Sequence, residues 1–126
     1  MSVQPEVVIN CAAISSPRKC EEEKEAAAAT NVPTALLTWM KGLHSPTAPL
    51  LIHLSTDQVY DGTKAYNKEE DETKPVNTYG RTKLAAEALI RSTWPHYAIL
   101  RSSLIVGPQP VVKLPRTLPL LVGILL

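Results

Sequence analysis

Three apolar runs, separated by two helix-forming stretches, constrain this chain more than any other feature of its sequence. The runs cover residues 7–10, 50–55 and 97–101, and each is short and rich in aliphatic residues. Such runs are typical of strands that are buried on both faces of a parallel sheet. The order strand, helix, strand, helix, strand indicates right-handed crossover connections. We therefore expect an α/β fold with a parallel sheet, and the third strand could continue to Val106.

The stretch between the first two runs predicts a helix with one interruption. Residues 19–30 consist mainly of Glu, Lys and Ala, which favour helix. We expect a kink near Asn31 and a second helical part that has Pro33 in its first turn. Gly42 and the Ser45–Pro46 pair should end that part. Trp39 lies within it and is expected to be a core residue.

The stretch between the second and third runs predicts a long loop and then a helix. Residues 61–75 are polar and show no periodicity, which indicates a surface loop, and the acidic run 69–72 should be solvated. Asn77 or Thr78 can cap a helix that continues to about Ser92. Its expected buried stripe consists of Leu84, Ala85, Ala88 and Leu89.

The predicted topology brings three segments to one edge of the sheet. Because ligands of open α/β sheets bind beyond the carboxyl ends of the strands, residues 11–13, 55–57 and 102–104 should line one crevice. Tyr79 and Lys83 are four residues apart on the following helix, so both side chains can reach that crevice from one helix face.

These residues suit the reduction of a carbonyl group. Such a reduction needs a hydride on carbon and a proton on oxygen, and the Tyr79 phenol can supply the proton. A nearby Lys83 ammonium would favour the phenolate and could donate hydrogen bonds to the ribose hydroxyls of a nicotinamide nucleotide. A hydroxyl from Thr56, or as a less favoured alternative from Ser55, would hold the substrate carbonyl.

Composition excludes several other classes of function. The net charge is +1 and no basic face is evident, so nucleic-acid binding is not expected. The two cysteines lack metal-ligand spacing, and no basic segment followed by an apolar run opens the sequence, so we expect a cytoplasmic protein without a metal site. Residues 111–126 are apolar but too few to cross a bilayer, and two prolines interrupt them.

Two further side chains have structural interpretations. Cys11 is expected to pack beside small residues. His53, inside an apolar run, is expected to be a hydrogen-bonded structural histidine and not a catalytic one.

The order and spacing of several segments resemble the extended short-chain dehydrogenases/reductases, and within them the branch of dTDP-4-dehydrorhamnose reductase-like proteins. The regulatory beta subunit of methionine adenosyltransferase is similar as well. The matching segments are 8–13, 30–32, 54–62, 70–71, 75–87, 100–103 and 107–108. The resemblance implies a partial Rossmann-like, doubly wound parallel sheet within residues 1–108, followed by a divergent apolar tail, 109–126.

The resemblance also implies roles for individual residues. Thr56, Tyr79 and Lys83 correspond to the catalytic trio of the family, with Tyr79 as the proton donor. Lys83 would also bind the cofactor, which is NADP or NAD in this family. Gln58 stands where relatives often have an aromatic residue, which leaves the substrate undefined.

Two small-residue pairs correspond to cofactor-binding stretches of the family. Ala12 and Ala13 resemble the stretch along the adenosine ribose and pyrophosphate, and Ser102 and Ser103 resemble the stretch near the nicotinamide.

The chain departs from the family pattern before residue 7. Members of the family carry a strand, a glycine-rich loop with its helix, and two further strands ahead of the segment equivalent to residues 7–10. The five glycines of this chain cannot form G-x-G-x-x-G. We therefore expect weak NADP or NAD binding by this chain alone, and an apolar strand 7–10 at a sheet edge, with marginal stability.

Three functions remain open from the sequence. The chain resembles a reductase that acts on a keto-sugar nucleotide or another small carbonyl compound, in truncated form. Alternatively, it resembles a non-catalytic regulatory subunit with methionine adenosyltransferase as its protein partner. The third possibility is an inactive truncated product.

Overall fold

The computed structural model describes residues 4–43 and 47–104. The elements in chain order are β1 (Val7–Asn10), α1 (Pro17–Glu22), α2 (Lys24–Asn31), α3 (Thr34–Lys41), β2 (Leu50–Thr56), the short 3-10 helix η1 (Asp57–Val59), α4 (Thr78–Thr93) and β3 (Tyr97–Ser102). The predicted helix end at Ser45–Pro46, the continuation of the third strand to Val106 and the tail 109–126 lie outside the described residues.

The three strands form one parallel sheet in the order β1-β2-β3. Val7 pairs with Leu50 in register, and Leu51 pairs with Tyr97. The α/β class and the parallel sheet are therefore confirmed. Among the described strands β1 lies at one edge and β3 at the other, as expected for β1.

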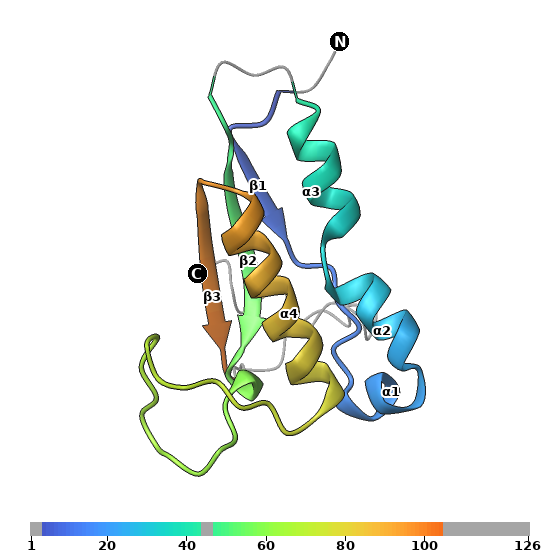
Figure 1. Ribbon diagram of the computed structural model, residues 1–126, viewed down its shortest axis with the longest axis vertical. Helices are drawn as coiled ribbons and strands as arrows, with labels where there is room; N and C mark the ends of the chain where they lie inside the picture. Colours follow the sequence, from blue (N-terminus) through green and yellow to red (C-terminus); the bar gives the residue numbers. More distant parts are fainter. Residues whose placement is uncertain (1–3, 44–46, 105–126) are drawn as a thin grey trace, which may run out of the picture.

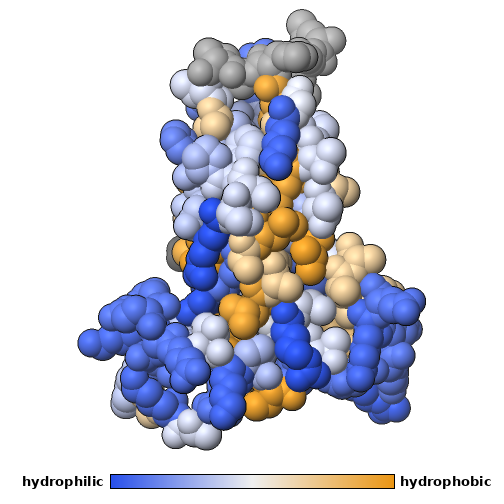
Figure 2. Space-filling model, in the orientation of Figure 1, coloured by the Kyte–Doolittle hydropathy of each residue, from blue (hydrophilic) through white to orange (hydrophobic). Residues whose placement is uncertain are grey.

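The helices α3 and α4 lie side by side on one face of the sheet, while α1 and α2 sit beside the carboxyl ends of the strands (Figure 1). The hydrophobic core lies between the upper helices and the sheet and consists of Leu37, Met40, Leu51, Ile90 and Trp94. The Trp94 indole N–H also donates to the carbonyl of Pro49 at 3.0 Å. Figure 2 shows a narrow hydrophobic seam between these helices, and hydrophilic residues over the long loop and over α1 and α2.

The opposite face of the sheet is exposed, so the prediction of strands buried on both faces is wrong for this structure. Val7, Ile9, Leu50 and Leu100 are exposed hydrophobic residues of the three strands. The cause is that the described helices pack on the other face alone (Figure 1). An apolar run cannot indicate by itself which of its two faces a neighbour will cover.

The predicted helix 19–30 is two helices. Glu23, with φ −125° and ψ 60°, separates α1 from α2. Tertiary contacts override the helix propensity of this stretch: the Glu21 carboxylate accepts a hydrogen bond from the Thr78 N–H at 2.6 Å, which ties α1 to the start of α4. The interruption at Asn31 is confirmed, because α2 ends there and α3 begins at Thr34 after Pro33.

Three predictions of burial are wrong. Trp39 is 49% exposed on α3, and Cys11 is exposed at the end of β1. In α4, Ala85 and Ala88 are exposed and Leu84 and Leu89 are half-buried. The fully buried face of α4 carries mostly small or polar residues, which are Thr78, Gly80, Thr82, Lys83, Ala86, Glu87 and Ile90. Polar side chains can be buried on that face because Thr82, Lys83 and Glu87 each have a hydrogen-bond partner on another element.

Candidate active site

The hydroxyl of Thr56 lies at the carboxyl end of the central strand β2. Its Oγ1 accepts a hydrogen bond from the Gln58 N–H at 3.2 Å and donates to Asp57 Oδ1 at 3.3 Å. Thr56 thus caps η1, which turns the chain away from the sheet directly after the strand. This capping role fixes the hydroxyl at the edge where the predicted crevice lies.

The first turn of α4 is held tightly against η1. Asn77 caps the helix, since its Oδ1 accepts from the Gly80 N–H at 2.7 Å, and its Nδ2 donates to Gln58 Oε1 at 2.8 Å. A Cβ on residue 80 would lie 2.2 Å from the Gln58 carbonyl oxygen, so only glycine allows this approach. The same approach brings Tyr79 beside Thr56.

Tyr79 is half-buried and is hydrogen-bonded to Thr56. Burial raises the pKa of the phenol, and the hydrogen bond with Thr56 offsets only part of that rise. The phenol is therefore protonated at physiological pH. Lys83, which was expected to favour the phenolate, is not among the causes of this shift, so that expectation stays a prediction.

Lys83 lies one turn further along α4 and is 2% exposed. Its Nζ donates a hydrogen bond to the carbonyl oxygen of Leu54, near the carboxyl end of β2. Burial lowers the pKa of Lys83 to about 8. The ammonium is thus available at the strand ends, but it contacts the backbone of β2 instead of the Tyr79 phenol.

The loop that follows β1 is fixed by two asparagines. The Ala12 N–H donates to Asn10 Oδ1 at 3.2 Å, and the Ile14 N–H donates to Asn31 Oδ1 at 2.7 Å. Asn31 also donates from Nδ2 to Thr82 Oγ1 at 2.9 Å, which joins this loop to α4. Sequence reasoning placed Asn31 at a kink and missed this connection.

The predicted cofactor-binding residues lie at the same edge of the sheet. Ala12 is exposed and Ala13 half-buried after β1, and Ser102 and Ser103 are exposed at the end of β3. The Ser102 hydroxyl donates to the Ser55 carbonyl at 3.4 Å. Small side chains therefore lie at the carboxyl ends of both strands that neighbour β2, and Ser102 pairs with Thr56 in register.

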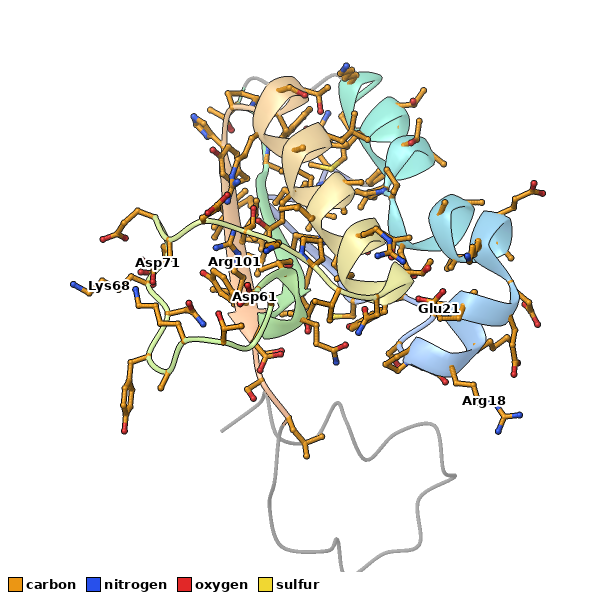
Figure 3. The ribbon with its side chains drawn as sticks, turned by 60° about the horizontal axis from the view of Figure 1, so that its bottom comes forward. Arg18, Glu21, Asp61, Lys68, Asp71 and Arg101 are labelled. Atoms are coloured by element: carbon orange, nitrogen blue, oxygen red, sulfur yellow. The ribbon has the colours of Figure 1, made fainter. Side chains whose placement is uncertain are left out.

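A buried charge network beside the site was not predicted. The carboxylate of Glu87, fully buried, accepts the Ser55 hydroxyl at 2.5 Å and the Arg101 guanidinium at 2.9 and 2.6 Å. Arg101 also donates to the Tyr60 hydroxyl at 2.6 Å and to the Glu69 carbonyl at 3.2 Å. In Figure 3 Arg101 lies beside the long loop that carries Asp61, Lys68 and Asp71.

One feature of the sequence, the spacing of Glu87, indicates part of this network. Glu87 follows Tyr79 and Lys83 at the spacing of one helical turn each, so the three side chains share a face of α4. Its partner Arg101 cannot be found in this way, because it comes from β3.

His53 is a buried, hydrogen-bonded residue of β2, as predicted. Asn10 Nδ2 lies 3.0 Å from His53 Nδ1, and His53 Nε2 has no hydrogen-bond partner among the described residues. Burial, together with the nearby Lys83 ammonium, lowers the pKa of His53 to about 4. The imidazole is therefore neutral at physiological pH.

A cavity of about 760 Å³ adjoins the site on the side of the long loop. Asp57, Gln58 and Asn77 line its end next to Thr56 and Tyr79, and Lys68 and Arg101 line its other walls. Thr56, Tyr79 and Lys83 do not line it themselves. The candidate catalytic side chains thus lie outside this cavity.

The described ranges 4–43 and 47–104 contain neither a candidate metal site nor a candidate membrane-spanning helix. No cluster of three or more His, Cys, Asp or Glu side chains that could ligate a metal ion occurs in them. None of their helices has the length and apolar character needed to cross a bilayer.

Comparisons with known proteins agree on one family. The family model described as RmlD substrate binding domain matches residues 1–112. A dTDP-4-dehydrorhamnose reductase of Sinorhizobium fredii is 40% identical over 102 residues, which cover 79% of this chain and 33% of that protein. The methionine adenosyltransferase 2 subunit beta of Danio rerio is 38% identical over 112 residues, covering 89% of this chain and 33% of that protein.

A solved structure is similar as well. The dTDP-4-dehydrorhamnose reductase from Bacillus anthracis, in complex with NADP, matches with a TM-score of 0.72 and 27% identity. The match covers 84% of this chain and 37% of that one. The parallel sheet is thus part of a Rossmann-like fold, and the chain spans about a third of the length of the relatives it matches.

Proposed function

Because the chain belongs to the RmlD substrate binding domain family, we propose that it carries the proton-donating part of an NAD(P)-dependent reductase site for a keto-sugar nucleotide. The observation that supports this most is the half-buried Tyr79 phenol, which lies beside Thr56 at the carboxyl end of β2. The relative in S. fredii is named a dTDP-4-dehydrorhamnose reductase, which suggests a dTDP-linked 4-keto sugar as substrate.

The residues present fit a nicotinamide nucleotide. The cofactor lies along strand ends in Rossmann-like folds, and here the strand ends carry small side chains and a buried ammonium. Ala12 and Ala13 would contact its adenosine half, Ser102 and Ser103 its nicotinamide half, and Lys83 its ribose. When bound, the cofactor would supply the hydride that reduces the substrate carbon. A cytoplasmic location, where such nucleotides are available, is part of this proposal.

In this proposal Tyr79 and Thr56 handle the substrate oxygen. Because burial raises its pKa, the Tyr79 phenol stays protonated at neutral pH and can give its proton to the oxygen as negative charge develops there. The Thr56 hydroxyl, whose oxygen is held by the Gln58 N–H, would turn from Asp57 to donate a second hydrogen bond to the same oxygen. Lys83, with a pKa of about 8, would donate hydrogen bonds to the sugar hydroxyls of the cofactor.

The test is reductase turnover by the purified chain with NADPH at high concentration and dTDP-4-dehydrorhamnose, followed by the loss of NADPH fluorescence. Removing the phenolic hydroxyl with Tyr79→Phe should lower the rate about 10²- to 10⁴-fold, the usual contribution of a positioned general acid. Tyr66→Phe is the matched control, since Tyr66 is 96% exposed in the long loop and should leave the rate unchanged. Equal rates for the chain and its Tyr79→Phe variant would refute the proposal.

Cofactor affinity can be measured separately. The described residues contain no glycine-rich phosphate loop, so we expect weak binding of NADP and NAD. Calorimetry that gave micromolar affinity for the isolated chain would contradict this expectation.

A second candidate function follows from the Danio rerio relative, whose match covers 89% of this chain. That protein is named a subunit of methionine adenosyltransferase 2, so a methionine adenosyltransferase is the protein partner to test. Co-purification of the chain with the catalytic subunit, unaffected by Tyr79→Phe, would favour a binding role over a catalytic one. Absence of a complex at micromolar concentrations would exclude it.

A further inference from the structure

Two buried charged side chains, one turn apart on α4, contact consecutive residues of the central strand. Glu87 is fully buried and accepts the Ser55 hydroxyl at 2.5 Å. Lys83 donates from Nζ to the carbonyl oxygen of Leu54. Ser55 directly precedes Thr56, so both contacts lie within two residues of the candidate catalytic hydroxyl. The helix is therefore docked on β2 next to the candidate site.

The Glu87 carboxylate also reaches the third strand. Arg101 of β3 donates to it from Nε at 2.9 Å and from Nη2 at 2.6 Å. In register Arg101 pairs with Ser55, and the next pair is Ser102 with Thr56. One carboxylate thus joins α4 to both strands, one residue before the site on each. Paired bonds between a guanidinium and a carboxylate fix geometry as well as charge, so this junction holds the three elements at defined positions.

The junction extends to the segment that leaves the site. Arg101 Nη1 donates to the Tyr60 hydroxyl at 2.6 Å, and that hydroxyl donates to the carbonyl oxygen of Lys68 at 2.7 Å. Tyr60 directly follows η1, which begins at the residue after Thr56. The turn beyond Thr56 is therefore tied back to Glu87 through Arg101.

Stability alone does not explain a carboxylate at this position. Taking an ionised group out of water is costly, and a buried ion pair is often no more stabilising than apolar side chains of the same volume. The face of α4 that carries Glu87 also carries Tyr79, two turns earlier. A contact that fixes this face on the strands also fixes the phenol.

From these contacts we propose that Glu87 is a positioning residue of the candidate site: it holds α4 against β2 and β3 so that Tyr79 stays beside Thr56. It acts through Ser55 and Arg101, since its own carboxylate is fully buried. The consequence for catalysis rests on the proposed reductase function, whereas the placement of the phenol does not.

The test measures the access of a reagent to the Tyr79 phenol. Tetranitromethane nitrates a tyrosine through its phenolate, so the half-buried Tyr79, with its raised pKa, should react slowly. Its nitration in the full chain, with a stabilising osmolyte, is quantified by peptide mass spectrometry against Tyr66, which is 96% exposed and serves as reference in the same sample. In Glu87→Gln the ratio of the two rates should rise at least about threefold, since a fall of one pKa unit alone raises the phenolate fraction about tenfold. An unchanged ratio would overturn the proposal.

Met40→Ala is the matched control for lost stability. Met40 is 1% exposed and packs in the hydrophobic core, so its truncation destabilises the chain without removing a contact of Glu87. Its nitration ratio should equal that of the unaltered chain, and a rise as large as in Glu87→Gln would contradict a specific role. If Glu87→Gln does not fold, Ser55→Ala takes its place, because it removes the contact with β2 and keeps the pair with Arg101. The ratio should rise in this variant too, and an unchanged ratio would overturn the proposal.

Turnover of dTDP-4-dehydrorhamnose with NADPH gives a separate readout. A misplacement of about 1 Å can cost about 10²-fold in rate, so Glu87→Gln should lower kcat by about that factor and leave KM nearly unchanged. A kcat equal to that of the unaltered chain would also overturn the proposal. If the unaltered chain shows no turnover, the proposed function fails, whereas the nitration ratios still decide whether Glu87 positions the phenol.

Discussion

Replacing Glu87 with glutamine tests the buried charge network most directly. The side chain is fully buried and accepts the Ser55 hydroxyl at 2.5 Å and Arg101 at 2.9 and 2.6 Å. Burial by itself would raise the pKa of Glu87, but the hydrogen bonds from Arg101 and Ser55 outweigh it and lower the pKa. The carboxylate is therefore ionised at neutral pH, and glutamine removes its charge while keeping its volume.

The expected cost follows from what the substitution leaves behind. The Arg101 side chain is 11% exposed and would lose its carboxylate partner. Breaking a buried ion pair by removal of one partner costs about 3–5 kcal/mol. Because Arg101 keeps its bonds to the Tyr60 hydroxyl and the Glu69 carbonyl, we expect the lower end, about 3 kcal/mol of unfolding free energy.

The assay is urea unfolding followed by circular dichroism, with a stabilising osmolyte if the variant is partly unfolded in buffer. Glu22→Gln is the matched control: its pair with Arg18 has a similar length, 2.8 Å, but the two side chains are 58% and 89% exposed. The control should cost less than about 0.5 kcal/mol. A loss below about 1 kcal/mol of unfolding free energy for Glu87→Gln would refute the reasoning. So would a double variant Glu87→Gln, Arg101→Met whose loss equals the sum of the two single losses, since coupled pairs show about 0.5–3 kcal/mol of interaction energy.

Three further predictions concern titration and packing. The pKa of His53 is lowered to about 4, so the unfolded chain binds more protons than the folded chain between pH 6.5 and 4. The unfolding free energy should therefore fall by about 3 kcal/mol on acidification through this window. His53→Gln should remove that dependence in unfolding measurements. The pKa of Lys83, lowered to about 8 from 10.5, acts in the same direction at higher pH: the unfolding free energy should rise from pH 8 towards 10. The raised pKa of Tyr79 should reverse the trend at still higher pH, and Lys83→Met should flatten the rise. Gly80→Ala places a Cβ 2.2 Å from the carbonyl oxygen of Gln58 in η1 and should lower the unfolding free energy by about 1–3 kcal/mol or more in urea unfolding. Gly42→Ala is the control: its nearest contact is at 3.4 Å, so it should change stability little.

Local sequence patterns predicted the strands well because each apolar run has a length and composition that only one kind of element accommodates. Strand β1 coincides with the predicted run 7–10, and β2 and β3 extend one residue beyond theirs. The break at Glu23 could not be predicted in this way, because it depends on the contact of Glu21 with Thr78, far along the chain.

Burial was harder to predict than secondary structure. The buried face of α4 carries Lys83 and Glu87, and its alanines Ala85 and Ala88 are exposed. A rule that places apolar residues inward fails where polar side chains find partners on other elements. For the candidate site, the spacing of Tyr79 in α4 and of Thr56 after β2 was sufficient to predict their proximity, whereas the catalytic roles of both residues stay predictions.

The contact between Glu21 and the first turn of α4 links two parts of the candidate site that are far apart in sequence. Helix α1 directly follows the loop that holds Ala12 and Ala13, and its carboxylate receives the N–H of Thr78, the residue before Tyr79. In Figure 3 Glu21 lies between α1 and α4, whereas Arg18 points away from both. A displacement of that loop would therefore pull on the turn that carries Tyr79, so Glu21 links the ends of two strands mechanically.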